Sequence, residues 1–352
     1  MNSQQIAQLR LQQQQIGRSH FTQPAALVKW MGCIQAQDYA GAKWAVGNRV
    51  KDSTDAGIEK DFNEGKILRT HVLRPTWHFI SPEDIGWMLQ LTAPKIKAFN
   101  KNLHTRLGIS DKDLKRSKTI ICTALSNKTF LTRSTLIPLL TKAKINTDDI
   151  RLGFHLMDAE LDGLICSGPR QGKQFTYALL ADRAPATATM DREAAIARLT
   201  RLYFSSRGPA TVNDFQWWSG LSMADIKKGL LLNKTFLTHI VTNGQAYWFS
   251  ADAPPTATHA TPALLLPSYD EYAVAYKDRS DILNPAWLLQ TGHGIFKPVV
   301  VINGQISGIW SRKEMRDKLV VDTQLLHANK TAGKAITAAM QAYAGFMGKT
   351  LA

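Results

Sequence analysis

The chain has 352 residues, of which 44% are hydrophobic and 20% charged, and Lys and Arg outnumber Asp and Glu by 43 to 28. A chain of this length buries a sizeable core in about two to three domains, which excludes a disordered tail and a small disulfide-stapled fold. The net charge of +15 favours a polyanionic partner, with nucleic acid and an anionic membrane surface as the usual ones. A basic protein without such a partner is the alternative that charge alone leaves open.

The cysteines and the hydrophobic runs indicate which further classes of protein are not expected. Cys33, Cys122 and Cys166 are odd in number, far apart and without a C-x-x-C pair, so we expect neither a disulfide framework nor a zinc finger. The first residues are polar and Gln-rich, unlike a secretory signal. No apolar run approaches the ~18 residues needed to cross a membrane. We therefore expect no membrane partner, and a protein of the reducing cytoplasm.

Residues 1–100 are predicted to contain several helices followed by a small hairpin. Pro24 suits the first turn of a helix, and Leu27, Met31 and Ile34 recur at helical spacing. Helices followed by a hairpin are typical of a winged helix. The expected helices cover residues 4–15, 24–38, 42–50 and 54–65, and the expected strands cover residues 67–73 and 77–80.

The same order of elements occurs twice more. Gly220 separates two short predicted helices, which form the best helix-turn-helix candidate, and the second of them is the candidate recognition helix. Asn243-Gly244 is a strong hairpin signal. The second group has helices over 113–126, 132–144 and 148–161 and strands over 163–167 and 174–179. The third has helices over 192–205, 212–218 and 223–232 and strands over 236–241 and 246–250.

The last part of the chain is predicted to be rich in strands. Residues 251–256 resemble a linker, strands are expected over 263–266, 298–302 and 306–310, and a final helix over about 323–347. The fold class is therefore α+β, with three tandem winged-helix motifs and a C-terminal strand-rich segment. Winged helices mostly bind DNA, but many only contact proteins, so fold alone does not settle function. The expected domains are 1–100, 101–185, 186–250 and 261–352.

Common cofactor motifs are missing from the sequence. It has no phosphate-binding G-x-x-x-x-G-K-[ST] loop, no G-x-G-x-x-G, no H-E-x-x-H and no G-x-S-x-G. The nine histidines show no metal-ligand spacing with cysteines or acids. We therefore expect neither a metal nor another cofactor.

Two glutamines in the string Ile34-Gln35-Ala36-Gln37-Asp38 are candidate catalytic residues. The string is predicted to close an apolar helix, on which positions i and i+2 do not face each other, so the helix must end or distort between them if they act together. An amide both donates and accepts hydrogen bonds, so two of them can hold a water without acting as a strong base. The alternative is that they cap the helix or lie in solvent.

The predicted hairpin between residues 69 and 78 is the second candidate. Its strand and turn residues include Arg69, Arg74, His71, His78 and Trp77. This composition suits a contact to a nucleic acid backbone or base. The alternative is an ordinary surface hairpin with the Trp side chain in the core.

Together these strings resemble the AlkZ-type winged-helix DNA glycosylases. They run in the family order and, with the C-terminal strands, cover most of the chain. The strings are Gln35-Ala36-Gln37-Asp38, Arg74-Pro75-Thr76-Trp77-His78, Gly208-Pro209-Ala210-Thr211 with Asp214-Phe215-Gln216-Trp217-Trp218-Ser219-Gly220, and Leu265-Leu266-Pro267-Ser268-Tyr269-Asp270-Glu271-Tyr272 with Tyr276-Lys277-Asp278-Arg279.

The resemblance implies three winged helices that form a concave, basic face for double-stranded DNA, with Gln35 and Gln37 at the catalytic centre. It implies hydrolysis of the N-glycosidic bond of alkylated purines, chiefly N7-alkylguanine, and some members process bulky adducts or interstrand crosslinks. One branch of the family has Gln-x-Asp instead of Gln-x-Gln. The chain departs from the family at Pro75 and Trp77, where a small residue and an aliphatic one are usual, and this bears on lesion range.

From this resemblance we expect a monomeric, nucleoid-associated, monofunctional DNA glycosylase. His78 is expected to contact DNA near the lesion, supported by Arg74 and Thr76, while Arg170 and Lys173 at the second hairpin tip are candidate phosphate contacts. Two alternatives remain. A non-catalytic winged-helix regulator would carry one such module rather than three and would prefer one undamaged sequence. A protein-interaction scaffold would show no salt-dependent DNA binding.

Overall fold

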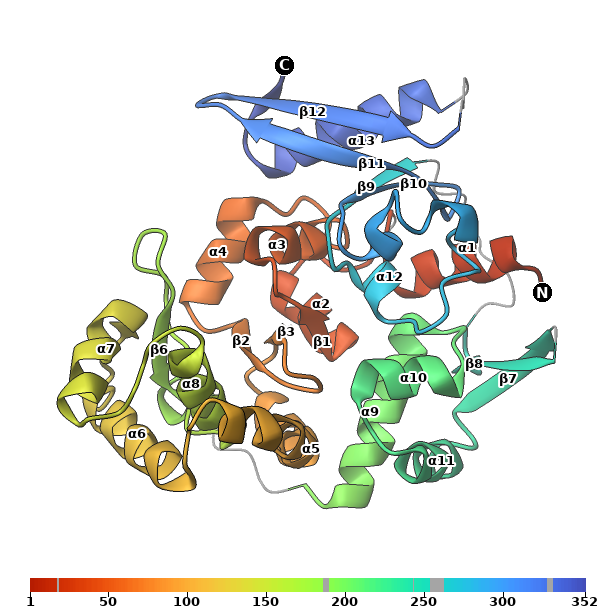
Figure 1. Cartoon of the computed structure of the whole chain (residues 1–352). Coiled ribbons are helices and arrows are strands. Elements are labelled where there is room, and N and C mark those ends of the chain that lie inside the picture. Colours follow the sequence, from red (N-terminus) through yellow and green to blue (C-terminus); the bar gives the residue numbers. More distant parts are fainter. Residues whose placement is uncertain (18, 186–189, 243, 254–262, 328–331) are drawn as a thin grey trace. The chain divides into compact units, whose positions relative to one another are not determined.

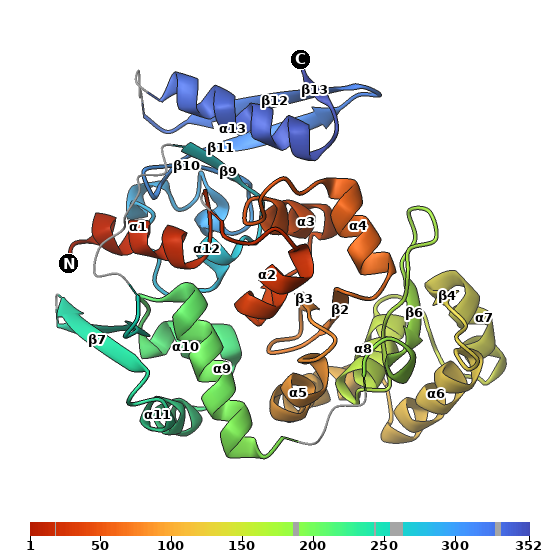
Figure 2. The same ribbon diagram turned by 180° about the vertical axis from the view of Figure 1, so that it is seen from behind.

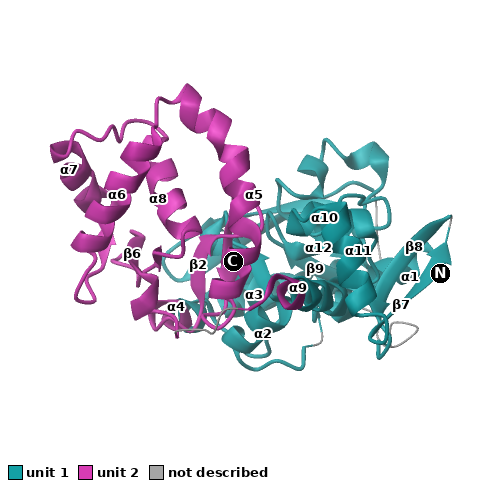
Figure 3. Ribbon diagram, turned by 90° about the horizontal axis from the view of Figure 1, so that it is seen from below, with its two compact units in different colours: residues 1–59, 196–352 teal, residues 60–195 magenta. Residues whose placement is uncertain are grey.

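The computed structural model describes residues 1–352 except 18, 186–189, 243, 254–262 and 328–331 (Figure 1). The chain forms two compact units, drawn in different colours in Figure 3. Unit 1 consists of residues 1–59 and 196–352, and unit 2 of residues 60–195. The chain passes from one unit to the other within α4 (Asp55–Asn63) and again within α9 (Arg192–Arg207).

A five-stranded sheet forms one part of unit 1, in the order β13-β12-β11-β10-β9. Its strand pairs are antiparallel except for β12 with β13, which is parallel. Helix α13 covers one face of this sheet, as Figures 1 and 2 show from opposite sides. The elements are β9 (Ala263–Leu266), β10 (Val299–Ile302), β11 (Gln305–Glu314), β12 (Lys318–Leu325), α13 (Gly333–Phe346) and β13 (Thr350–Leu351).

The remaining elements of unit 1 surround the candidate catalytic segment. Helix α1 packs against the sheet through Ala7 and Leu11, which share a buried cluster with Leu266 and Val301. The antiparallel pair β7–β8 follows the two short helices α10 and α11. The elements are α1 (Ser3–Gln13), α2 (Pro24–Met31), β1 (Cys33–Gln35), α3 (Tyr39–Gly47), α10 (Val212–Ser219), α11 (Met223–Leu232), β7 (Leu237–Thr242), β8 (Gln245–Ser250) and α12 (Glu271–Val274).

Unit 2 contains two hairpins and four helices of its own. A three-stranded sheet of this unit has the order β4-β6-β5, and a buried cluster that includes Ile121, Leu140 and Leu156 joins α6, α7 and α8. Ser110 and Thr132 cap α6 and α7 through their side chains. The elements are β2 (Leu68–His71), β3 (Trp77–Ile80), α5 (Ile85–Arg106), α6 (Asp111–Ala124), β4 (Leu131–Thr132), α7 (Arg133–Lys142), α8 (Arg151–Leu161), β5 (Ile165–Ser167) and β6 (Thr176–Leu179).

Local sequence signals predicted the helix-turn-helix candidate well. Thr211 caps α10, Gly220 ends it in the left-handed conformation that glycine tolerates, and Ser222 caps α11. The mixed α and β class is confirmed, whereas the three winged helices and the four-part division of the chain stay predictions. The predicted turn at Asn243 and the end of the linker, residues 254–256, lie outside the described residues.

Two predicted helices were wrong in their extent. The helix expected over residues 24–38 ends at Met31, because Gly32 adopts a positive φ of 73°. Of the final helix expected over 323–347, residues 333–346 form α13, residues 323–325 belong to β12, and residues 328–331 lie outside the described residues. In β12 the buried Leu319 and Val321 alternate with residues that are more exposed. No helix in the described ranges combines the length and the apolar character needed to cross a membrane.

A buried ion pair ties α12 to the end of α3 and yields a stability prediction. The Arg49 Nη2 and Nη1 atoms lie 2.7 and 2.9 Å from the two carboxylate oxygens of Asp270, and both side chains are buried. Asp270→Asn leaves Arg49 without its counter-charge, so we expect the free energy of unfolding in urea to fall by about 3 kcal/mol. As a control, Glu64→Gln removes a carboxylate from exposed ion pairs and is expected to leave the urea midpoint unchanged.

Candidate active site around Gln35 and Gln37

The segment that carries the two glutamines is not a helix end but a short strand followed by a bend. Strand β1 begins after Gly32 and ends at Gln35, the chain bends at Gln37, and Asp38 caps α3 by accepting a hydrogen bond from Gly41 N at 3.1 Å. The predicted helical setting was therefore wrong, because the helix ends three residues before the motif begins. The geometric objection to paired action at positions i and i+2 of a helix no longer applies.

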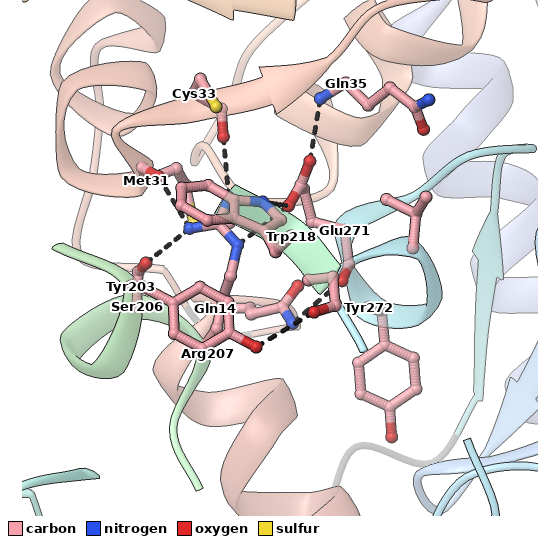
Figure 4. A network of polar contacts seen from close by, with 12 residues as sticks. Gln14, Met31, Cys33, Gln35, Tyr203, Ser206, Arg207, Trp218, Glu271 and Tyr272 are labelled. Carbon is pink, nitrogen blue, oxygen red and sulfur yellow. Dashed lines mark hydrogen bonds and ion pairs between the residues drawn. The ribbon is translucent and has the colours of Figure 1, made fainter. Parts of the chain in front are cut away.

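The two glutamines differ in their exposure. Gln35 is 6% exposed, and its side-chain oxygen is buried without a hydrogen-bond partner among the described residues. Gln37 is exposed. Figure 4 shows that the amide end of Gln35 points away from the polar network that holds its backbone. The segment thus presents one buried amide with an unsatisfied acceptor and one exposed amide two residues later.

A buried carboxylate holds the backbone of Gln35. Glu271 Oε1 accepts a hydrogen bond from Gln35 N at 2.9 Å, while Glu271 Oε2 accepts from Arg207 Nη2 at 2.7 Å and from Trp218 Nε1 at 3.0 Å. The three side chains of the network are fully buried. Arg207 also donates to the carbonyl of Cys33 at 2.7 Å (Figure 4).

A second layer of polar side chains supports this network. Gln14 Nε2 donates to the Tyr276 hydroxyl at 3.0 Å, and that hydroxyl donates to the carbonyl of Arg207 at 2.8 Å. Burial raises the pKa of Tyr276 to about 12, which keeps its hydroxyl protonated and able to donate at neutral pH. Asp270 is engaged elsewhere, since it binds Arg49 and caps α12.

Three of the four family-like strings meet in unit 1. The string around Gln35 contacts the string with Glu271, which in turn contacts Trp218 of the third. Asp214 of that third string also accepts hydrogen bonds from the backbone of Lys277 and Asp278. These strings were recognised in the sequence, but no role was predicted for Glu271 or Arg207. The signal available was an acidic residue that follows a buried strand, with no indication of its distant partner.

The predicted DNA-contacting residues of the first hairpin lie in unit 2. His78 is buried, and its Nδ1 lies 2.9 Å from the carbonyl of Thr76 in the same turn. Arg74 and Thr76 are half-buried and belong to a tight turn in which Thr76 N donates to the carbonyl of Arg74 at 2.7 Å. His78 therefore lies where it shapes the turn, and its contact with DNA stays a prediction.

The second hairpin carries a basic tip that is joined to the first by stacked side chains. Lys173 is exposed, and the half-buried Arg170 donates to the carbonyl of Lys173. The guanidinium carbons of Arg170 and Arg69 lie 4.0 and 4.5 Å from the ring centroid of Phe175, and Arg69 lies 4.3 Å from that of Trp77. These cation–π contacts hold the tip loop against β2 and β3.

Other chemistry-bearing groups near the glutamines are occupied. Lys43 of α3 binds the carboxylates of Asp55 and Glu59, each at 2.8 Å. Cys33, Cys122 and Cys166, all among the described residues, form no disulfide. Within the described part of the chain, no group of three or more His, Cys, Asp or Glu side chains is arranged to hold a metal ion.

Comparison with known proteins identifies the family. A family model described as DNA glycosylase AlkZ-like matches residues 28–346. The chain belongs to the AlkZ-like DNA glycosylase family. It is 24% identical over 336 residues to the interstrand DNA cross-link repair glycosylase of Streptomyces sahachiroi, covering 90% of this chain and 89% of that protein. The solved structure of Streptomyces sahachiroi DNA glycosylase AlkZ has the same fold, with a TM-score of 0.81 at 21% identity, covering 100% of this chain and 99% of that one.

Membership in the AlkZ-like family decides between the classes of protein that the sequence left open. The chain is a DNA N-glycosylase that acts in DNA repair, and DNA is its partner. A non-catalytic regulator and a protein-interaction scaffold are both disfavoured. The roles of the individual side chains remain to be tested by substitution.

The basic hairpin tip yields a prediction about salt. If Lys173 binds a phosphate, Lys173→Ala flattens the plot of log K against log salt concentration by about 0.9, because one fewer counterion is released. Fluorescence anisotropy with a short undamaged duplex measures this slope. Lys66→Ala is the control, since Lys66 is exposed but already paired with Asp61 and Glu64. Unchanged slopes for Lys173→Ala and Arg170→Ala would count against this tip as a DNA contact.

Proposed function

We propose that this AlkZ-like glycosylase hydrolyses the N-glycosidic bond of alkylated purines, chiefly N7-alkylguanine, with a water held by Gln35 and Gln37. The observation that carries the proposal is the buried side-chain oxygen of Gln35, which has no hydrogen-bond partner among the described residues. A buried acceptor of this kind suits a bound water or a substrate group. The exposed Gln37 two residues later supplies a second amide.

The chemistry of the lesion suits a site without a strong base. Alkylation at N7 puts a positive charge on the purine and makes it a good leaving group, so the base needs no protonation. The transition state resembles an oxocarbenium ion with a nearby water, as in glycoside hydrolysis. The enzyme then supplies positioning and electrostatic stabilisation. Two neutral amides suffice for such an activated base and are weak catalysts for an unmodified one, which spares normal DNA.

The charged groups near Gln35 support a role for the amides. Both oxygens of Glu271 already accept hydrogen bonds, and both oxygens of Asp270 face Arg49. Neither carboxylate is placed to take a proton from a water. Lys43 is bound by two carboxylates, which does not favour a Schiff-base lyase step. A monofunctional glycosylase is therefore the reaction class that we propose.

Crosslinks and bulky adducts form a separate part of the proposal. The relative from Streptomyces sahachiroi is described as an interstrand DNA cross-link repair glycosylase. At 24% identity, and with Trp77 in the hairpin where the family usually has an aliphatic residue, we propose simple N7-alkylpurines as the first substrates to examine. We propose that the enzyme acts on double-stranded DNA as a monomer.

The decisive experiment measures excision from a duplex with a single N7-methylguanine. Enzyme in excess is incubated with the duplex, and abasic sites are cleaved with mild alkali. We expect strand breaks above the rate of spontaneous depurination. Gln37→Ala should lower the single-turnover rate by about 100-fold while leaving DNA affinity unchanged, because it removes an amide that acts mainly in the transition state.

A matched control is Gln4→Ala, which removes an exposed amide from α1 and is expected to leave the rate unchanged. Excision by Gln37→Ala at the normal rate would contradict the assigned role of Gln37. A wild-type protein that produced no breaks above spontaneous depurination would contradict simple N7-alkylguanine as the substrate.

A further inference from the structure

The backbone edge of β1 is held by side chains. In an extended chain, residues i and i+2 present their backbone polar groups to the same edge, so the carbonyl of Cys33 and the N–H of Gln35 point the same way. Arg207 Nη2 donates to that carbonyl at 2.7 Å, and Glu271 Oε1 accepts from that N–H at 2.9 Å. Arg207 Nη1 also donates to the carbonyl of Met31 at 2.7 Å. Figure 4 shows these bonds along one side of the segment.

The donor and the acceptor that bind β1 are themselves bonded to each other. Arg207 Nε and Nη2 lie 2.8 and 2.7 Å from Glu271 Oε2, so the pair presents one donor and one acceptor at fixed spacing. This is the pattern that a neighbouring strand would present to the same edge. Trp218 Nε1 adds a third bond to Oε2 at 3.0 Å and its ring lies 4.4 Å from the guanidinium carbon. The whole assembly is fully buried.

The backbone carbonyls of Arg207 and Glu271 are also hydrogen-bonded, which holds the two residues in place. Arg207 is the last residue of α9, and its carbonyl accepts from the Tyr276 hydroxyl at 2.8 Å. Glu271 is the first residue of α12, and its carbonyl lies 3.4 Å from Gln14 Nε2. A rotation of either side chain would therefore leave a buried charge or a backbone group unpaired. Such unpaired buried groups are strongly unfavourable.

We propose that the Arg207–Glu271 ion pair is the positioning device for Gln35: at this one edge of β1 it takes the place that a further strand would occupy, and it sets the direction in which the Gln35 amide points. The inference rests on the proposed function, in which that amide aligns the nucleophilic water. A continuous partner strand would hold the chain beyond Gln35 as well. The ion pair ends its contacts at Gln35 N and so leaves the chain able to bend at Gln37. Glu271 is a positioning residue, since both of its oxygens are occupied and neither touches the reacting atoms.

A double-mutant cycle tests whether the pair acts through Gln35. Glu271→Gln keeps an acceptor and the side-chain shape but removes the charge that Arg207 binds. We expect it to slow single-turnover excision of N7-methylguanine by about 10- to 100-fold, the scale expected when a reacting group is displaced by about 1 Å. In a Gln35→Ala background the same change should cause no further loss. Rates that multiply in the double variant would show that Glu271 does not act through Gln35.

Amide hydrogen exchange gives a readout that does not depend on activity. In the wild type, the Gln35 N–H is bonded to Glu271, and we expect its exchange to be slow. It should become at least tenfold faster in Glu271→Gln, measured on peptides that cover residues 33–37. If the wild type excises no alkylated purine, the proposed function fails. Hydrogen exchange of the Gln35 N–H would still test whether the Arg207–Glu271 pair holds β1. Unchanged exchange in Glu271→Gln would overturn the positioning role, whatever the activity.

Two further variants separate positioning from loss of stability. Glu160→Gln is the matched control, because it removes the charge of another buried carboxylate, which pairs with His71 within unit 2. It should lower stability while leaving Gln35 exchange and excision unchanged. Trp218→Phe serves if Glu271→Gln does not fold, since it removes the Nε1 donor to Glu271 and part of the ring that lies against Arg207 but leaves both charges of the pair in place. We expect a two- to tenfold slower excision from Trp218→Phe, again with no effect in the Gln35→Ala background.

Discussion

The buried ion pair between Arg207 and Glu271 is the contact on which the active-site region of unit 1 depends. It joins the end of α9, the start of α12 and the edge of β1, three parts of the chain that are far apart in sequence. Buried charges are tolerated only when they are paired and their remaining donors and acceptors are bonded. Every element around the pair must therefore keep its position, because a shift in any one of them unpairs a charge that water does not reach.

The same constraint bears on the proposal that the reaction relies on neutral amides although two carboxylates lie near Gln35. Glu271 and Asp270 are adjacent in sequence, but each has its own arginine, Arg207 and Arg49. Their charges are compensated and their oxygens are taken, whereas the amide of Gln35 keeps a buried oxygen without a hydrogen-bond partner among the described residues. An amide cannot be ionised, and its strength as a catalyst lies in orientation rather than in basicity. In the mechanism that we propose, selectivity for a purine that is already cationic follows from the weakness of the catalyst.

Local signals and long-range contacts differ in how far the sequence predicts them. The caps at Thr211 and Ser222 and the turn at Gly220 act within a few residues, and the helices they bound were predicted closely. The motif with Gln35 was predicted to lie on a helix, because the helical spacing of hydrophobic residues continues past Gly32. The helix itself ends at Met31. The bond from Gln35 N to Glu271 spans 236 residues and depends on how α9, α10 and α12 pack. No local pattern specifies such a contact. The four family-like strings therefore indicated the family but not the hydrogen bonds among Arg207, Glu271 and Gln35.

The division of the chain also bears on how lesions are selected. The two glutamines and their network belong to unit 1, and the basic hairpin tip with Arg170 and Lys173 belongs to unit 2. Contacts from such side chains to phosphates fix position on a duplex but carry no sequence information. Binding of that kind favours damaged and undamaged DNA almost equally. Under the proposed mechanism, discrimination arises in the chemical step, where only a base that leaves readily reacts at a site made of amides. A repair glycosylase that must act in any sequence context gains from this arrangement, since affinity for a particular sequence would hold it away from most lesions.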